Sequence, residues 1–240
     1  MGESFGAWTM GSDAALIDYV SSVNIACGFH AGDASIIRKT VETAITKGIK
    51  IGAHPSFPDL QGFGRREMKM SAGEIFDIVL YQVSAVKGVC EAFGARLNHV
   101  KPHGALYNKA AKDAEISAAI VEAVKRTDET LIFYGLSGSF LISEAEKIGL
   151  RTASEVFADR TYRADGTLTP RTEPNALIHD SKQAIAQVLE MILEQKVTAA
   201  DGEKVALKAE TICLHGDGKH ALEFARLINA ELTRCGINIM

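Results

Sequence analysis

The sequence predicts an α/β fold in which a parallel β-sheet is covered by helices. From residue 20 onward, short β-branched and apolar runs alternate with longer segments of helical periodicity, and no long linker separates them. An open doubly wound sheet and a closed barrel both fit this alternation. No repeat or break in composition divides the chain, so we expect one domain over residues 1–240. The expected strands are 21–27, 49–53, 96–101, 131–134, 150–155 and 211–214.

Helices are expected between these strands, and the clearest follows the second strand. Ser71 and Glu74 can form a capping box at its start, and Gly94 is placed to end it. Another apolar stripe begins at Ile37 and stops at Gly48. The apolar positions step by three and four residues, as on one face of a helix. They are Ile75, Val79, Val83, Val86, Cys90 and Phe93 in the first helix, with weaker stripes at Ile116–Val124, Ile185–Ile192 and Leu222–Ile228.

The composition is that of a globular protein and narrows the class of partner. Hydrophobic residues make up 47% and charged residues 23% of 240 residues, which is enough to form a sizeable core. The formal charge of -4, without long runs of one sign, argues against nucleic acid or a membrane surface as partner. The four cysteines form no C-x-x-C pair, which favours reduced thiols. No leader or apolar run of about 20 residues is seen, so we expect a cytoplasmic protein.

Ionisable side chains gather where the expected strands end. The carboxyl ends of parallel strands lie on one face of such a fold, where ligands bind. Four of the seven histidines occupy equivalent positions there, which separate structural roles would not readily arrange. We therefore predict one shared site. The side chains are His30 and Asp33; His54, Asp59, Arg65 and Arg66; Lys101, His103 and Asn108; Glu155, Asp159, Arg160 and Tyr162; and His215 and Asp217.

Simpler roles compete for several of these residues. Asp33 and Asp217 precede expected helices, where an aspartate caps free backbone N–H groups. His99 and His179 are expected to be structural or surface residues. The long irregular segment 156–175 is rich in charges and turn formers, which is typical of a functional or disordered loop.

Two chemistries fit the expected site, and the residues leave both open. Imidazoles with the carboxylate of Asp33 can hold a divalent metal, although no tight H-x-x-H spacing supports this. Alternatively, histidine and aspartate act as acid and base while Lys101 and the arginines hold a small anionic substrate. A conventional nucleotide loop is absent, because "GLSGS" at 135–139 lacks the lysine of a phosphate-binding loop. Neither G-x-S-x-G nor G-x-G-x-x-G occurs.

Five motifs together resemble the LamB/YcsF family. They are "VNIACGFHAGD", "IGAHPSFPDLQGFGRR", "HVKPHGALYN", "SEVFADRTYRADGTLTPR" and "ICLHGD", and the likeness runs in order from residue 2 to about 236. The resemblance implies a distorted (β/α) TIM-like barrel of the glycoside hydrolase/deacetylase type. It also implies the A subunit of an ATP-dependent 5-oxoprolinase, which works with subunits B and C to open 5-oxoproline to L-glutamate. ATP would be a co-substrate, bound by this chain or by its partners. Association of several copies of this chain into a homo-oligomer also stays possible.

The resemblance and the strand-end residues together give a hypothesis for the site. The partners would activate the lactam and this chain would open the ring, with histidine or aspartate directing water and cations balancing charge. The residues do not decide which one is the base. We expect Asp33, His54, Lys101 and His103 to be catalytic. The expected substrate-binding residues are Asn24, His30, Arg65, Arg66, Asp159, Arg160, Tyr162 and His215, and no metal ligand is assigned.

The start of the chain departs from the family pattern. The family usually opens with a strand ending in D-x-N-x-D-x-G-E, whereas this chain begins "MGESFG". We therefore expect the first barrel strand to be missing, with an exposed sheet edge beside residues 21–27. Two other classes of function stay open, namely a metal-dependent amide or sugar deacetylase and a non-catalytic subunit that only binds the lactam.

Overall fold

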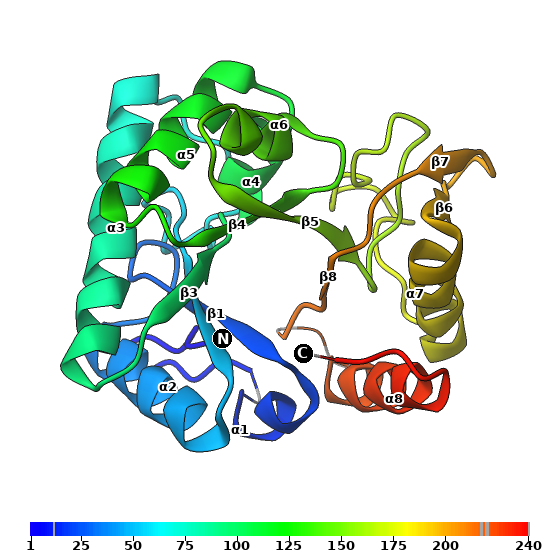
Figure 1. Cartoon of the computed structure of the whole chain (residues 1–240), viewed down its shortest axis with the longest axis horizontal. Helices are drawn as coiled ribbons and strands as arrows, with labels where there is room; N and C mark the ends of the chain where they lie inside the picture. Colours follow the sequence, from blue (N-terminus) through cyan, green and yellow to red (C-terminus); the bar gives the residue numbers. More distant parts are fainter. Residues whose placement is uncertain (12, 217, 219–220, 240) are drawn as a thin grey trace. The chain divides into compact units, whose positions relative to one another are not determined.

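The computed structural model describes residues 1–240 except Ser12, Asp217, Lys219, His220 and Met240 (Figure 1). The chain divides into two compact units. Unit 1 comprises residues 1–135 and 139–153, and unit 2 comprises residues 136–138 and 154–240. All four of the residues expected to be catalytic lie in unit 1. The single-domain organisation stays a prediction.

Unit 1 is built on parallel strands in the order β1-β2-β3-β4. In register, Asn24 pairs with Gly52 and Ala26 with His54, while His99 pairs with Ile132. Helices α2, α3, α5 and α6 pack against their neighbours in that order (Figure 1). The strands are β1 (Ser22–Ala26), β2 (Lys50–His54), β3 (Leu97–Val100) and β4 (Ile132–Leu136). The helices are α1 (Asp13–Leu16), α2 (Ala34–Lys47), α3 (Ala72–Ala92), α4 (Gly104–Ala110), α5 (Ala114–Thr127) and α6 (Phe140–Lys147), with a 3-10 turn at Ile17–Tyr19.

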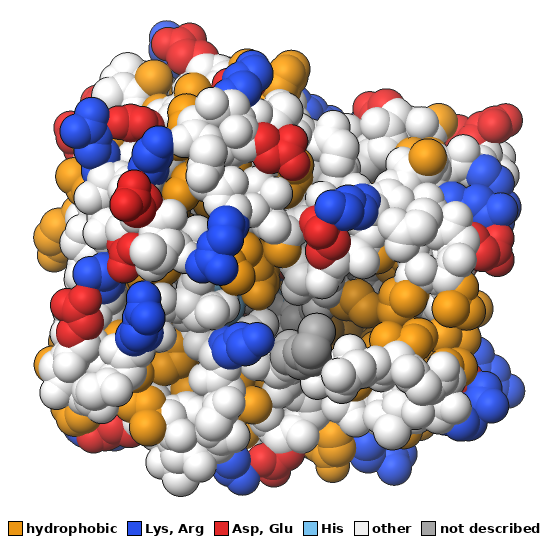
Figure 2. Space-filling view, viewed as in Figure 1, with side chains coloured by type: hydrophobic (Ala, Val, Ile, Leu, Met, Phe, Trp, Pro, Cys, Tyr) orange, Lys and Arg blue, Asp and Glu red, His pale blue; other side chains and the backbone are white. Residues whose placement is uncertain are grey.

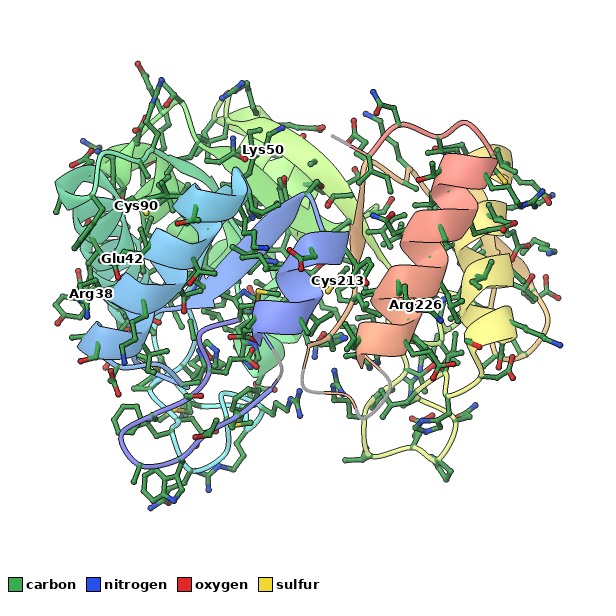
Figure 3. All side chains as sticks on the ribbon, turned by 90° about the horizontal axis from the view of Figure 1, so that it is seen from below. Arg38, Glu42, Lys50, Cys90, Cys213 and Arg226 are labelled. Carbon is green, nitrogen blue, oxygen red and sulfur yellow. The ribbon has the colours of Figure 1, made fainter. Side chains whose placement is uncertain are left out.

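The local signals in the sequence place the helix ends of unit 1 correctly. Ser71 and Glu74 form the expected capping box at the start of α3. Gly48 ends α2 in the left-handed conformation, and its N–H donates to the carbonyl oxygens of Ala44 and Ile45. On the surface of α2, Arg38 and Glu42 form an exposed ion pair (Figure 3). The sequence does not predict α4, because a helix of 7 residues is too short to show a recognisable apolar stripe.

The expected sheet edge beside residues 21–27 is present in unit 1. Among its described residues, β1 is the outermost strand of the sheet. Met1 lies along this edge: its amino group donates to the carbonyl oxygen of Asn24 (2.8 Å), and the N–H of Ala26 donates to the carbonyl oxygen of Met1 (3.1 Å). These two hydrogen bonds cover part of the edge and fix the start of the chain against β1.

Unit 2 contains a parallel pair, a hairpin and two helices. Strand β5 (Arg151–Phe157), which begins in unit 1, pairs with β8 (Thr211–Cys213). Strands β6 (Lys196–Thr198) and β7 (Lys204–Ala206) form the antiparallel hairpin. Helices α7 (Ser181–Glu194) and α8 (Ala221–Arg234) pack against each other. All six predicted strands are therefore confirmed. The predicted stripe of α7 is confirmed in part: Val188 is buried and Ile185, Leu189 and Ile192 are half-buried, while Ala184 and Met191 complete the buried face.

The loop after β5 is held by buried polar side chains. Arg160 donates from Nε to the carbonyl oxygen of Ala176 (3.1 Å) and from its guanidinium to that of Thr169. The hydroxyl of Tyr162 accepts the N–H of Phe157 (2.8 Å). Both side chains are at most 3% exposed. The expected irregular segment 156–175 is thus a loop with specific internal contacts once β5 ends.

The surface and the thiols agree with the composition. Acidic and basic side chains are interspersed over the face of unit 1 seen in Figure 2, without a field of one sign. All four cysteines are free thiols, and Cys90 is a buried residue of α3 (Figure 3). Burial raises the pKa of Cys90 to about 11. Within the described part of the chain, no helix combines the length and apolar character needed to cross a bilayer.

Adding a methyl group at two glycines of unit 1 will have opposite effects. A Cβ at Gly52 would lie 2.1 Å from His99 Nε2, whereas one at the exposed Gly88 of α3 meets no atom within 4 Å. We expect Gly52→Ala to lower the free energy of unfolding by about 1–3 kcal/mol through overpacking. Gly88→Ala should raise it by about 0.5–1 kcal/mol, because alanine favours helix. Urea unfolding of both variants measures this, and equal effects would contradict it.

Candidate functional site

The ends of β1, β2 and β3 bring His30, His54 and His103 together in unit 1, as predicted. The rings of His30 and His103 stack face to face, with centroids 3.9 Å apart and planes within 7°. His54 meets His103 edge to face at 4.8 Å. All three residues are at most 9% exposed. We call these three residues the histidine cluster.

A chain of hydrogen bonds fixes two rings of the histidine cluster. His54 Nδ1 lies 2.6 Å from the carbonyl oxygen of Lys101, and His54 Nε2 lies 3.0 Å from His103 Nδ1. His103 Nε2 lies 2.8 Å from the carbonyl oxygen of Phe63. A carbonyl oxygen only accepts, so both outer nitrogens carry hydrogen. Three hydrogen bonds therefore need three hydrogens on two rings, and the pair holds one positive charge when all three are formed.

Burial and neighbouring cations disfavour that charge on His54. Burial holds the pKa of His54 well below its ordinary value, with further lowering from His103 and Lys101. Burial likewise lowers the pKa of His30 to about 3. His30 is thus neutral near pH 7, and when all three hydrogen bonds are formed, the lowered pKa of His54 favours the third hydrogen on His103. A cationic ring stacked on the neutral ring of His30 is a favourable arrangement.

The loop 55–66 covers the histidine cluster. Phe63 presents its ring edge to His103 at 5.3 Å and to His30 at 5.5 Å. Gly64 has a φ of +64°, and a Cβ there would lie 2.2 Å from Ser56 Oγ and 2.9 Å from His103 Cδ2. Only glycine therefore fits this position, where the backbone approaches the rings most closely.

The two arginines of this loop have different roles. The Asp59 carboxylate accepts hydrogen bonds from the N–H of Gly62 (2.9 Å) and from Nε of Arg66 (3.0 Å). Arg66 thus closes the loop on itself. Arg65 instead lies over the ring of Phe63, with its guanidinium carbon 4.9 Å from the centroid. Of the two expected substrate-binding arginines, Arg65 is the one that contacts Phe63, whose ring packs against the histidine cluster.

Two buried side chains, one in the histidine cluster and one in the covering loop, have hydrogen-bonding atoms without a partner among the described residues. Both ring nitrogens of His30 and the hydroxyl of Ser56 are in this state. Such atoms are rare in proteins, because each unsatisfied polar group costs free energy. These atoms retain hydrogen-bonding capacity that a ligand or a water molecule would satisfy. The sequence did not predict Ser56 as a site residue, because a serine after a proline indicates only a loop.

Lys101 and Asp33, the other two residues expected to be catalytic, have different environments in unit 1. Lys101 is 5% exposed, and its ammonium lies 5.7 Å from the ring centroid of Tyr107 on α4. Asp33 caps α2: one carboxylate oxygen accepts the N–H of Ile36 (2.9 Å), and the other accepts the N–H of Gly6 (2.9 Å). The capping role of Asp33 is therefore confirmed, while its catalytic role stays a prediction.

Asn24, on β1, contacts the ring of His99 on β3. Its side-chain oxygen is 3.0 Å from His99 Nε2, and the His99 ring stacks on Tyr134 at 4.1 Å. The ring occupies the space that the missing Cβ of Gly52 leaves. His99 is thus a buried structural residue, as expected, and it orients Asn24.

Unit 2 contains its own polar pair, formed by Asp159 and His215. His215 Nδ1 lies 2.9 and 3.0 Å from the two carboxylate oxygens of Asp159. The other predicted residues of this unit, Arg160 and Tyr162, are buried in the loop contacts described above, and their substrate-binding role stays a prediction. Asp217 lies outside the described residues.

No metal centre is formed by the residues that the structure describes. Among them, no group of three or more His, Cys, Asp and Glu side chains is arranged to hold an ion. The nitrogens of His54 and His103 face each other and backbone oxygens, which leaves their lone pairs unavailable without rearrangement.

Parallel strands with ionisable groups at their carboxyl ends define an α/β protein with the arrangement in which such folds bind ligands. The chain belongs to the LamB/YcsF family, which it matches over residues 1–240. It is 56% identical to the 5-oxoprolinase A subunit of Tolumonas auensis over 239 residues, covering all of this chain and 95% of that protein. Identity to the protein of the same name from Bacillus subtilis is 54%, covering 100% and 93%.

A solved structure confirms the fold class. The crystal structure of the lactam utilization protein from Thermus thermophilus matches with a TM-score of 0.93 at 45% identity, covering 100% of this chain and 96% of that one. The predicted α/β fold of the TIM-like type is therefore confirmed.

Buried neutral histidines will make the protein sensitive to acid. Burial lowers the pKa of His99 to about 3, whereas an unfolded histidine titrates near 6.5. The contribution of each such histidine to the free energy of unfolding is therefore fully present above about pH 6.5. It is lost as the pH drops toward 3, by up to about 1.4 kcal/mol per pH unit. His99→Gln should be less stable at pH 7.5 but lose less stability on acidification. Urea unfolding at several pH values measures both, and the exposed His179→Gln serves as the control. An unchanged slope in His99→Gln would contradict the assignment.

The hydrogen count of the cluster can be measured directly. In protein labelled with ¹⁵N-histidine, we expect His103 to show hydrogen on both ring nitrogens at pH 7. His54 should show hydrogen on Nδ1 only, because its Nε2 accepts from His103. His54→Gln and His103→Gln assign the signals. Two neutral rings would show that one of the three hydrogen bonds is absent in solution.

Proposed function

We propose that this chain is the A subunit of an ATP-dependent 5-oxoprolinase. Working with subunits B and C, it would open 5-oxoproline to L-glutamate. The relatives named as 5-oxoprolinase A subunits support the activity. The single structural observation that carries the proposal is the buried histidine cluster, in which the ring nitrogens of His30 have no partner among the described residues. A small cyclic amide with a carboxylate has the donors and acceptors that such a site requires.

The chemistry requires activation before the ring can open, since an amide is a poor electrophile. Transfer of a phosphoryl group from ATP to the amide oxygen would give an activated ring carbon. Water then adds to that carbon, the C–N bond breaks, and the nitrogen takes the protons of the water. A second water molecule would hydrolyse the resulting acyl phosphate, which gives glutamate and phosphate. We place activation with the partner subunits, because this sequence lacks a conventional nucleotide loop.

The residues of unit 1 have distinct roles in this proposal. His30 and Ser56 would hydrogen-bond the ring amide or a water molecule through the atoms that lack a partner among the described residues. The charge shared by His54 and His103, together with Lys101, would stabilise negative charge that develops on oxygen. Arg65 would attract the substrate carboxylate. The free thiols of the chain fit a cytoplasmic location.

Reconstitution with subunits B and C tests this proposal. We expect glutamate release from 5-oxoproline only when ATP and all three subunits are present. His30→Asn and His103→Gln should lower kcat by about 10²- to 10⁴-fold. Asp33→Asn should have a much smaller effect, because asparagine caps a helix as well as aspartate does.

The outcomes separate the proposal from its alternatives. His179→Gln, at an exposed site, should retain full activity and serves as the control. Full activity of His30→Asn and His103→Gln would assign unit 1 a non-catalytic binding role. Amide or sugar deacetylation without partners, abolished by a chelator, would instead identify a metal-dependent hydrolase.

A further inference from the structure

The ends of β5 and β8 in unit 2 are joined by a set of hydrogen bonds that ends in a carboxylate and an imidazole. The N–H of Ala158 donates to the carbonyl oxygen of Cys213 (3.0 Å). One residue further on, the Asp159 carboxylate accepts the backbone N–H of His215 (3.2 Å) and faces its ring. His215 Nδ1 lies 2.9 Å from one carboxylate oxygen and 3.0 Å from the other. The ring and the backbone of His215 are therefore both fixed by one side chain.

This geometry selects one tautomer of the neutral ring. Because Nδ1 faces two carboxylate oxygens, it carries the hydrogen, and Nε2 carries the lone pair. The ring of Phe157 lies nearly parallel to that of His215, with centroids 5.7 Å apart and planes within 23°, and limits its rotation. The lone pair of Nε2 therefore has a fixed direction.

Asp159 keeps its negative charge at all physiological pH values. Burial alone would raise the pKa of this carboxyl group, but His215, followed by Arg171, holds it at about 2. The side chain of Asp159 is 14% exposed and that of His215 is 22% exposed. A largely covered carboxylate thus supports an imidazole that solvent or a substrate can reach.

We propose that Asp159 and His215 form a general-base dyad for the ring-opening reaction, with His215 Nε2 as the base and Asp159 as its positioning residue. This inference rests on the proposed function. In the step assigned to it, Nε2 takes a proton from water as the water oxygen bonds to the activated ring carbon. The imidazolium then returns that proton to the ring nitrogen as the C–N bond breaks. Asp159 stays ionised throughout and stabilises the imidazolium.

The sequence predicted a substrate-binding role for both residues. A purely structural role is a further alternative to the role of a base. A structural tie between β5 and β8 needs only an oxygen that accepts the N–H groups of His215, which asparagine also provides. A base needs the negative charge, because a neutral amide does not stabilise the imidazolium or fix the tautomer. Asp159→Asn therefore distinguishes the base from the structural tie.

Kinetics of the reconstituted enzyme with 5-oxoproline and ATP test the inference. We expect His215→Ala to lower kcat by about 10²- to 10⁴-fold, with partial recovery on addition of imidazole. Asp159→Asn should also lower kcat, and the acid limb of its pH–rate profile should move to lower pH. Thermal unfolding of both variants shows whether the fold is intact. Full activity of His215→Ala, or an unmoved profile in Asp159→Asn with full activity, overturns the inference.

A second measurement does not depend on activity. In ¹⁵N-histidine-labelled protein at alkaline pH, we expect hydrogen on Nδ1 of His215, and we expect Asp159→Asn to lose this preference. Hydrogen on Nε2 in the unsubstituted protein overturns the dyad. If the unsubstituted three-subunit mixture opens no 5-oxoproline, the proposed function fails. In that case, the tautomer still decides whether the dyad has the geometry of a base.

Discussion

The hydrogen bond between His54 Nε2 and His103 Nδ1 is the interaction on which the site in unit 1 depends. It joins the ends of β2 and β3, and its outer nitrogens are fixed by backbone oxygens of Lys101 and Phe63. This continuous chain sets the orientation of both rings and ties the covering loop to the sheet. His30 can then stack on a ring that does not rotate. Removing any of these acceptors would leave a buried N–H unsatisfied, which is why the arrangement is cooperative.

The same constraint explains the backbone of the covering loop. The loop must bring the carbonyl oxygen of Phe63 within hydrogen-bonding distance of His103 while keeping Ser56 close to the rings. Phe63 and Gly64 achieve this with positive φ values of 55° and 64°. A non-glycine residue in this conformation is uncommon and costs free energy. The internal contacts of Asp59 with Gly62 and Arg66 stabilise the turn that makes it possible.

Sequence patterns predicted what local rules determine. The six strands, the capping box of Ser71 and the meeting of His30, His54 and His103 follow from periodicity, caps and the common direction of parallel strands. Contacts between residues far apart in sequence were not predictable. The bond from Gly6 to Asp33, the pairing of Asn24 with His99 and the burial of Tyr162 each need the fold first. Ser56 has no signal of its own, because only its burial without a partner among the described residues makes it notable.

The two polar centres have different capacities for proton transfer, and hydrogen-bond counting shows why. Each ring nitrogen of His54 and His103 already faces a partner, so neither ring can accept another proton without breaking a hydrogen bond. The nitrogens of His30 have no partner in the described part of the chain, but burial makes its cation costly, which suits it to hydrogen bonding as a neutral ring. Asp159, in contrast, supplies a negative charge next to His215, and an imidazolium there is stabilised as it forms. Hydrogen bonding by a neutral ring therefore fits His30, whereas His215 beside Asp159 is the ring suited to accept a proton.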